Sequence, residues 1–271
     1  MADVPRARLK RALTSLRLRS LDARDRLTGR ADALVPPRRH QFVGEGDFVT
    51  IGDEFAGHFT ELAGLKATDR VLDVGCGIGR MARPLTKILD PERGRFEGFD
   101  VNPDGIAWCR RHYAGFPNFG FSVADVANGL YNPDGGQPAS EYRFPYADDS
   151  FDLVVATSVF THLLEAEAAH YLAESARVLA PGGRLFVTFF VLDEPSRAAV
   201  ARREAWLHFP EPAEGGAAAI LRADEPEFAI AYGRDWIEEQ LAALGLTTVT
   251  LEPGIWAAPQ GRTYQDIVVA Y

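Results

Sequence analysis

Three glycines and one carboxylate form the part of this chain best suited to bind a ligand. In the run VLDVGCGIGR an apolar stretch leads into Asp73, and Gly75, Gly77 and Gly79 follow at alternate positions. Glycines let the backbone turn sharply and let a ligand lie against main-chain amides without an intervening Cβ. A carboxylate suits a cationic group such as the ammonium of an amino acid and repels a phosphate. The run therefore predicts a site for a positively charged ligand that has no phosphate.

Two well-known phosphate-binding turns fit this run poorly. A P-loop needs Gly-Lys followed by Ser or Thr, and a dinucleotide site favours G-x-G-x-x-G, whereas this chain has GCGIGR. A glycine-rich turn is weak evidence for any ligand, so the prediction rests on the carboxylate before it.

Elements of alternating type must position this turn. The expected strands are 70–74, 95–100, 118–123, 151–157 and 184–190, with two more near the end of the chain. The expected helices include one that ends at Gly64, then 79–89, 103–114 and 165–179, with Pro181-Gly182-Gly183 stopping the last of these. Continuous apolar strands between helices are typical of a parallel sheet covered on both faces, so the fold class is doubly wound α/β.

Two long intervals interrupt the alternation, at about 127–147 and 193–233. Both follow the carboxyl ends of strands, where open α/β sheets bind ligands, so both are predicted to be lids over a substrate. The segment 34–48 carries a Pro pair and two glycines and is expected to be a linker or lid and not a packed element. The predicted division is an arm and linker over 1–40 and a globular domain over 41–271.

Charge is concentrated at the start of the chain. Residues 1–40 carry a net charge of +7, which leaves −16 for the rest. Leu9, Leu13 and Leu16 recur at helical spacing, so an amphipathic helix is expected from Pro5 to about Arg30. It is expected to dock on its own domain or on a second copy of the chain, giving a homo-oligomer; contact with an anionic membrane and a transit peptide are the alternatives.

Composition narrows the function classes further. The acidic body argues against a dedicated nucleic-acid binder, and no apolar run approaches the roughly 18 residues of a membrane span. Two cysteines, Cys76 and Cys109, are too few for a disulfide framework or a cysteine zinc site, and no His, Asp and Glu spacing suggests a metal site. A cytoplasmic protein without a metal is expected.

The pattern D-V-G-C-G-I-G resembles motif I of the class I S-adenosylmethionine-dependent methyltransferases. Further landmarks of that family follow in order: Asp100 ends FEGFD, Asp125 follows the next strand in VAD, and SFDLVVATSVFTHL and ARVLAPGGRLFVTFF match the fourth and fifth strands. The resemblance covers about residues 42–271. It implies a Rossmann-like, mostly parallel seven-stranded sheet whose last strand, in RTYQDIVVAY, is antiparallel.

The same resemblance implies a site for S-adenosyl-L-methionine, with S-adenosyl-L-homocysteine as the product. The turn would pass under the methionine part with Asp73 near its amino group, and Asp100 would accept both ribose hydroxyls. The remaining cofactor-binding residues implied are Gly75, Cys76, Gly77, Gly79, Val101, Asp125, Val126, Thr157 and Ser158. Of these, Asp125 and Val126 would meet the adenine, and Thr157 and Ser158 would lie near the sulfonium.

Methyl transfer from a sulfonium requires alignment of the acceptor, and a hydroxyl or ammonium acceptor must also lose a proton to a base. His162 is the leading candidate because it follows the fourth strand by about five residues, although a histidine bonded at a helix start is the alternative. Tyr142 and Arg143 lie in the first interval, where they could orient the acceptor or only support a lid.

A small-molecule acceptor, such as a natural product or a sugar-containing compound, is favoured because a base-flipping motif is absent after the fourth strand. Several aromatic residues of the two intervals suit a partly apolar pocket: Tyr131, Tyr142, Phe144, Tyr146 and Trp206. Two other readings remain open from the sequence: a cyclase or isomerase that binds the cofactor without transferring its methyl group, and a non-catalytic scaffold subunit.

Overall fold

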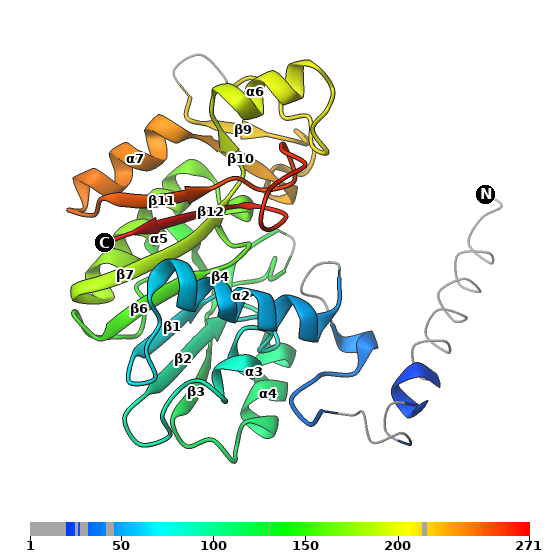
Figure 1. Ribbon diagram of the computed structural model, residues 1–271, viewed down its shortest axis with the longest axis vertical. Coiled ribbons are helices and arrows are strands. Elements are labelled where there is room, and N and C mark those ends of the chain that lie inside the picture. Colours follow the sequence, from blue (N-terminus) through cyan, green and yellow to red (C-terminus); the bar gives the residue numbers. More distant parts are fainter. Residues whose placement is uncertain (1–19, 25–26, 28–31, 42–45, 130, 213–215) are drawn as a thin grey trace.

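The computed structural model describes residues 20–24, 27, 32–41, 46–129, 131–212 and 216–271. A seven-stranded sheet with the order β11-β12-β7-β6-β1-β2-β3 forms the centre of the molecule (Figure 1). Its strands are β1 (Arg70–Val74), β2 (Arg95–Asp100), β3 (Phe119–Val123), β6 (Phe151–Ala156), β7 (Leu179–Phe189), β11 (Thr248–Glu252) and β12 (Asp266–Ala270). β12 is antiparallel to both neighbours and the five strands from β7 to β3 are parallel, which confirms the predicted fold.

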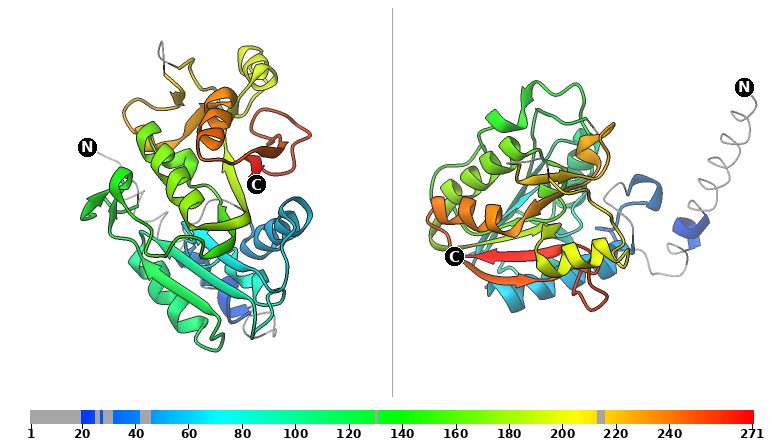
Figure 2. Two further views of the ribbon diagram at one scale, coloured as in Figure 1. Left: turned by 90° about the vertical axis from the view of Figure 1, so that its left-hand side faces the viewer. Right: turned by 90° about the horizontal axis from the view of Figure 1, so that it is seen from above.

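Each face of the sheet is covered by its own set of helices (Figure 2). The helices α2 (Phe48–Ala63), α3 (Ala82–Leu85) and α4 (Pro103–His112) pack on one face, and α5 (Glu165–Val178) and α7 (Arg234–Ala243) pack on the other. Along β6, Leu153 and Val155 pack into the hydrophobic core between the sheet and α2, α3 and α4. Val154 and Ala156 pack into the core between the sheet and α5 and α7. Burial on both faces explains why these strands read as continuous apolar runs.

The helix after the glycine turn is much shorter than the predicted 79–89: only α3 (Ala82–Leu85) is α-helical there. Pro84 has no N–H to donate, and the N–H groups of Thr86, Lys87 and Ile88 donate to carbonyls three residues back. The chain therefore continues in tight turns after α3.

The sequence suggested that the Pro181-Gly182-Gly183 run separates α5 from the following strand, but the run lies within that strand. β7 already begins at Leu179, and its register against β6 shifts between Phe151 and Leu153. The run is an irregularity within the strand, which Gly182 permits by its φ of 75°.

Both long intervals carry structure of their own. The first contains β4 (Val126–Ala127), β5 (Gln137–Pro138) and the 3-10 turn η2 (Ala139–Glu141). The second contains α6 (Glu194–Ala201), β9 (Ala218–Ile220), the 3-10 turn η4 (Pro226–Phe228) and β10 (Ile230–Gly233). β10 joins β9 to β8 (Val191–Leu192), and we call these three strands the small sheet.

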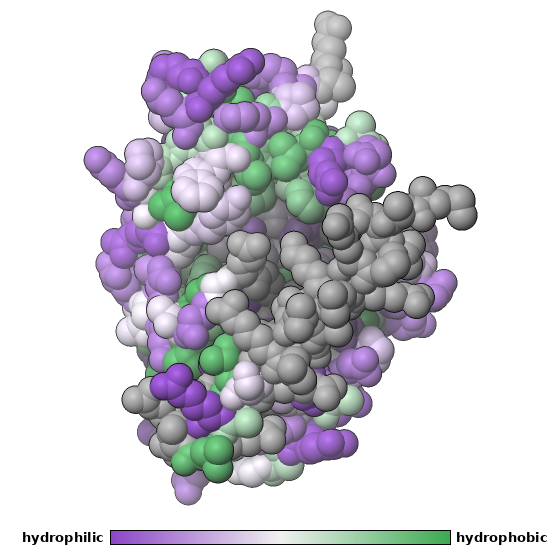
Figure 3. All heavy atoms as spheres, turned by 90° about the vertical axis from the view of Figure 1, so that its right-hand side faces the viewer, coloured by the Kyte–Doolittle hydropathy of each residue, from purple (hydrophilic) through white to green (hydrophobic). Residues whose placement is uncertain are grey.

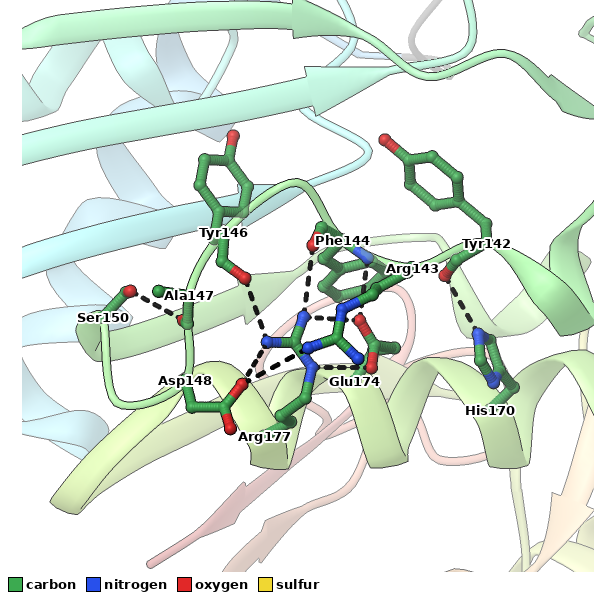
Figure 4. Close-up of polar contacts among 10 residues, drawn as sticks. All are labelled: Tyr142, Arg143, Phe144, Tyr146, Ala147, Asp148, Ser150, His170, Glu174 and Arg177. Atoms are coloured by element: carbon green, nitrogen blue, oxygen red, sulfur yellow. Dashed lines mark hydrogen bonds and ion pairs between the residues drawn. The ribbon is translucent and has the colours of Figure 1, made fainter.

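The first interval is fixed at its end by one guanidinium (Figure 4). Arg177 of α5 donates to the Phe144 carbonyl at 3.1 Å and the Tyr146 carbonyl at 2.9 Å, and it pairs with Asp148 at 2.7 Å. Glu174 holds the same guanidinium in place at 2.6 Å. This half of the predicted lid is anchored to α5.

The segment before α2 is partly packed, contrary to the expectation of a linker. Leu34 and Pro36 are buried, and the buried Arg83 pairs with both Asp32 and Asp53 at 2.7 Å. The short 3-10 turn η1 (Arg38–His40) follows. The predicted amphipathic helix over 5–30 lies largely outside the described residues, of which 20–24 and 27 are helical. In the described ranges no helix has the length and hydropathy to cross a membrane.

Candidate functional site

A cavity of about 1070 Å³ opens at the carboxyl ends of β1, β2 and β6. Ten of the thirteen predicted site residues line it: Asp73, Gly75, Cys76, Gly77, Asp100, Val101, Val126, Thr157, Ser158 and His162. The place agrees with the position of ligand sites in open α/β sheets.

The glycine turn is tied to the end of β2. The N–H groups of Gly75 and Cys76 both donate to the Phe99 carbonyl, at 2.9 and 3.0 Å, and that of Gly77 donates to Asp100 Oδ2 at 2.8 Å. A Cβ on Gly75, whose φ is 72°, would lie 2.6 Å from the Val159 side chain. These three amides are already used, so they do not form the anion cradle that a phosphate needs.

Asp73 is the most unusual group of the site. Its side chain is fully buried, and neither carboxylate oxygen has a hydrogen-bond partner. Burial, and next the charge of Asp100, raise the pKa of Asp73 well above its ordinary value. A buried carboxylate without a partner is costly, and a ligand cation would relieve that cost. The arrangement fits the ammonium of an amino acid.

Asp100 lies beside the turn and is partly buried. Its Oδ2 accepts from Gly77 and its Oδ1 accepts from the Asn102 N–H at 2.8 Å, so the carboxylate is held in one orientation. Burial raises its pKa against the lowering effect of these hydrogen bonds. Each oxygen keeps a second lone pair for a ligand hydroxyl, which suits a vicinal diol.

Three predicted site residues do not line the cavity. Asp125 is exposed, and its Oδ1 accepts from the Gly136 N–H at 2.9 Å, so its carboxylate closes the local loop. Gly79 is buried in the turn, where a Cβ would lie 3.1 Å from the Tyr113 hydroxyl. Tyr142 is buried in the core against Phe99 and Phe144, and its carbonyl accepts from His170 (Figure 4). Burial raises the pKa of Tyr142 to about 12, so the geometry opposes the predicted catalytic role of this residue.

A buried network that the sequence did not reveal supports the turn after β6. Ser158 adopts a φ of 59°, and its N–H donates to Thr188 Oγ1 at 2.8 Å. Thr188 donates to Gln265 Oε1 at 2.6 Å, and Gln265 donates to Thr161 Oγ1 at 3.3 Å. Gln265 also lines the cavity. Thr188 lies in β7 and Gln265 directly precedes β12, 77 residues farther along the chain, so no local pattern could have placed them here.

His162 lies in the cavity wall, in the 3-10 turn η3 (Phe160–His162). Its Nδ1 is 2.8 Å from the Glu227 carbonyl oxygen. A carbonyl only accepts, so Nδ1 carries the proton and Nε2 of the neutral ring is left with a lone pair. Burial lowers the pKa of His162, which favours this neutral form near pH 7. The ring can therefore accept a proton from a group bound in the cavity.

The wall also contains apolar and aromatic side chains that motif reasoning missed. They include Phe55 of α2, Phe190 after β7, Leu207 and Phe228 of the second interval, and Ile255 and Tyr264 before β12. Tyr131 and Trp206, which the sequence suggested, line the cavity as well. In the described part of the chain no group of three or more His, Cys, Asp or Glu residues could hold a metal ion.

Comparisons with known proteins agree with this architecture. Residues 72–187 match the model of a family described as "Methyltransferase domain". The phthiotriol/phenolphthiotriol dimycocerosates methyltransferase 1 of Mycobacterium ulcerans (strain Agy99) is 35% identical over 126 residues, which are 44% of this chain and 36% of that protein. Methyltransferase GfsG of Streptomyces halstedii is 29% identical over 153 residues, 55% of this chain and 49% of that protein. The chain thus matches about a third to a half of the length of these relatives.

Two solved structures share the fold over most of its length. The PH0226 protein from Pyrococcus horikoshii OT3 has a TM-score of 0.55 at 18% identity, covering 85% of this chain and 93% of that one. The [4+2]-cyclase SpnF has a TM-score of 0.54 at 20% identity, covering 83% and 85%. At these identities the likeness concerns the fold alone.

Proposed function

We propose that this chain, whose residues 72–187 form a class I S-adenosylmethionine-dependent methyltransferase domain, transfers a methyl group from that cofactor to an oxygen or nitrogen of a small-molecule acceptor. The observation that carries the proposal is Asp73, a fully buried carboxylate without a partner at the cavity wall. When bound, S-adenosylmethionine supplies a methyl group already activated by the sulfonium.

Different residues of the wall would bind different parts of the cofactor. Asp73 would hold the ammonium of the methionine part, and Asp100 would accept the ribose hydroxyls through its free lone pairs. Val101 and Val126 would lie against the adenine ring, because both line the cavity beyond Asp100. Asp125 takes no part in this assignment, since its carboxylate is bonded to Gly136.

His162 would act as the base. Its Nε2 lone pair can accept the proton that a hydroxyl or ammonium acceptor loses, and the Glu227 carbonyl keeps the ring in the required tautomer. Such a base contributes about 10²- to 10⁴-fold to a rate. The rest of the catalysis would come from alignment of the acceptor with the methyl group and from exclusion of water.

One matched relative supports a small-molecule acceptor, because its name describes a methyltransferase of phthiotriol and phenolphthiotriol dimycocerosates. The net charge of −9 is also unfavourable for contact with nucleic acid. The acceptor atom and the acceptor itself belong to the proposal.

Calorimetry with S-adenosylhomocysteine tests the cofactor site. Asp100→Ala is expected to weaken binding about 10- to 100-fold, because it removes charge-assisted hydrogen bonds of about 1.5 to 3 kcal/mol. Asp104→Ala, an exposed carboxylate in the first turn of α4, is the matched control and should bind like the wild type. Unchanged affinity in Asp100→Ala would refute the assignment.

A second experiment tests the reaction. The protein is incubated with methyl-labelled S-adenosylmethionine and a panel of hydroxylated and amino acceptors, and label in the product is measured. Because a cyclase shares this fold, the assay also follows the mass of each acceptor. Conversion of an acceptor without incorporation of label would replace methyl transfer by a cyclase or isomerase reaction.

A further inference from the structure

Four exposed aromatic side chains gather at one cavity. Tyr131, Trp206, Phe228 and Tyr264 have exposed fractions of 42%, 74%, 41% and 45%, and all four line the cavity. The other large hydrophobic side chains that are exposed in the described ranges lie elsewhere: Leu27, Val123, Leu164, Val249 and Tyr271. Exposed apolar surface around a cavity marks a binding site, whereas single exposed residues need no explanation.

From this arrangement we infer that the acceptor is an uncharged, largely apolar molecule whose body lies between these aromatic side chains. The inference rests on the proposed function and names the substrate class of the same site. We call the four residues the aromatic rim.

The rim is built by segments far apart in the sequence. Tyr131 belongs to the first interval, Trp206 and Phe228 to the second, and Tyr264 to the loop between β11 and β12. The space-filling view shows hydrophobic side chains at the surface of the upper part of the molecule, where Figure 1 places α6, β9 and β10, and also near its lower end (Figure 3). The positions of the four rim residues in separate segments show that the rim is formed by the folded chain and not by one local run.

Arg262, one of the two arginines of the wall, is paired within the protein. Arg262 pairs with Glu61 at 2.9 Å and Glu252 at 3.1 Å. The guanidinium of Arg80 lies over the Phe48 ring, 5.9 Å from its centroid. Arg262 already has two carboxylate partners, so it is not poised to receive a carboxylate or phosphate of an acceptor, and an uncharged acceptor fits this side of the wall better.

The glutamate of this wall lies near a histidine of its own helix. Glu54 lies 3.6 Å from His58 on the same helix, one turn away. Asp73 and Asp100 belong to the cofactor part.

The size of the cavity leaves room for a second molecule. Ligand sites commonly enclose about 300 to 1,000 Å³, and this cavity of about 1070 Å³ slightly exceeds that range. The residues assigned to the cofactor lie at the carboxyl ends of β1, β2, β3 and β6. Leu207 and Ile255 extend the wall on the side of the rim with further apolar surface.

The rim also lies next to the proposed base. The Tyr131 ring meets the His162 ring edge to face at 5.9 Å between centroids. Phe228 follows Glu227, whose carbonyl accepts from His162. An apolar body held by these side chains would place its reacting hydroxyl or amine near Nε2.

The test uses N-phenyl-1-naphthylamine, an uncharged probe that fluoresces in apolar sites. We expect the probe to bind the full chain, and Trp206→Ala and Tyr264→Ala each to weaken it about tenfold. Both rings are exposed, so these variants should keep the fold. Tyr271→Ala, an equally exposed aromatic outside the cavity, is the matched control and should bind like the wild type. Equal probe affinity in all four proteins would overturn the inference.

Competition distinguishes the chemistry of the ligand. 1-Dodecanol is expected to displace the probe at concentrations at least tenfold lower than dodecanoate does, and displacement by dodecanoate at equal or lower concentration would overturn the inference. Calorimetry with S-adenosylhomocysteine on the same variants keeps the two proposals separate. If the variants keep their affinity for S-adenosylhomocysteine but bind the probe more weakly, the result supports the aromatic rim. If the wild type does not bind S-adenosylhomocysteine, the proposed function is refuted, and the probe measurements alone then test whether the aromatic rim binds an apolar molecule.

Discussion

Replacing Asp73 by Asn is expected to stabilise the ligand-free protein and to weaken cofactor binding. The carboxylate is fully buried and has no hydrogen-bond partner, so burial and the charge of Asp100 raise its pKa. Above pH 3.8 the unfolded chain has released this proton and the folded chain still holds it. The free energy of unfolding therefore loses up to about 1.4 kcal/mol for each pH unit, until the pH reaches the raised pKa.

The amide of the Asn variant has no proton to release. The gain in unfolding free energy over the wild type should thus be close to zero near pH 4 and grow with pH, to at most about 4 kcal/mol at pH 7. Binding should change in the opposite direction, because a cofactor ammonium loses the carboxylate that neutralises it. Breaking a buried ion pair costs about 3 to 5 kcal/mol, which corresponds to at least a 100-fold loss of affinity.

Urea denaturation between pH 5 and 8 and calorimetry with S-adenosylhomocysteine measure the two effects. Asp224→Asn, which changes an exposed carboxylate outside the cavity, is the control and should move neither quantity. An Asn variant less stable than the wild type, or a stability difference that does not change with pH, would show that Asp73 is already paired in the folded state. Either outcome would remove the main argument for a cationic ligand.

Three further changes test the rest of the site. His162→Gln should lower the rate of methyl transfer about 10²- to 10⁴-fold. In the wild type the rate is expected to fall once the pH drops below the pKa of His162, which burial lowers from 6.5, and pH–rate profiles should show that the variant lacks this fall. Glu227→Ala removes the carboxylate that accepts from the Gly129 N–H but keeps the carbonyl beside His162, so steady-state kinetics should show a smaller loss of kcat and calorimetry an unchanged cofactor affinity. Asp266→Asn should lower the free energy of unfolding by about 1 to 3 kcal/mol, because the carboxylate accepts from two backbone amides and the Trp256 indole and an amide cannot accept at both ends. A gain in stability in this variant would mean that the buried charge, which burial disfavours by raising the pKa of Asp266 to about 6, costs more than these hydrogen bonds contribute.

The fold and the cofactor part of the cavity could be predicted because short runs of sequence form them. β1 passes directly into a turn whose glycines have φ values of 57° to 81°, and Asp73 is buried because it belongs to a central strand. Asp100 ends the adjacent strand, so the topology alone brings the two carboxylates together. Periodicity and glycine spacing report such features directly.

Local competition explains why Asp125 and Tyr142 do not line the cavity. Asp125 follows β3 as the pattern requires, but the Gly136 N–H is within reach and binds the carboxylate outside the cavity. Tyr142 lies in the interval named as a lid, yet Arg177 anchors the residues that follow it and the ring enters the core. The sequence pattern predicts the order of the elements, but the positions of these two side chains depend on contacts with residues elsewhere in the chain.

The acceptor part of the cavity has a different origin, and this has a consequence for its chemistry. Glu227 joins both intervals, since its carboxylate accepts from Gly129, 98 residues away, and its carbonyl accepts from His162, 65 residues away. The segment that carries Phe228 of the aromatic rim therefore also fixes the tautomer of the proposed base. A change that remodels η4 to admit a different acceptor would at the same time alter the orientation of His162. On the proposed assignment, acceptor choice and proton transfer would be coupled through this one segment, while the residues proposed to bind the cofactor on β1 and β2 would remain as they are.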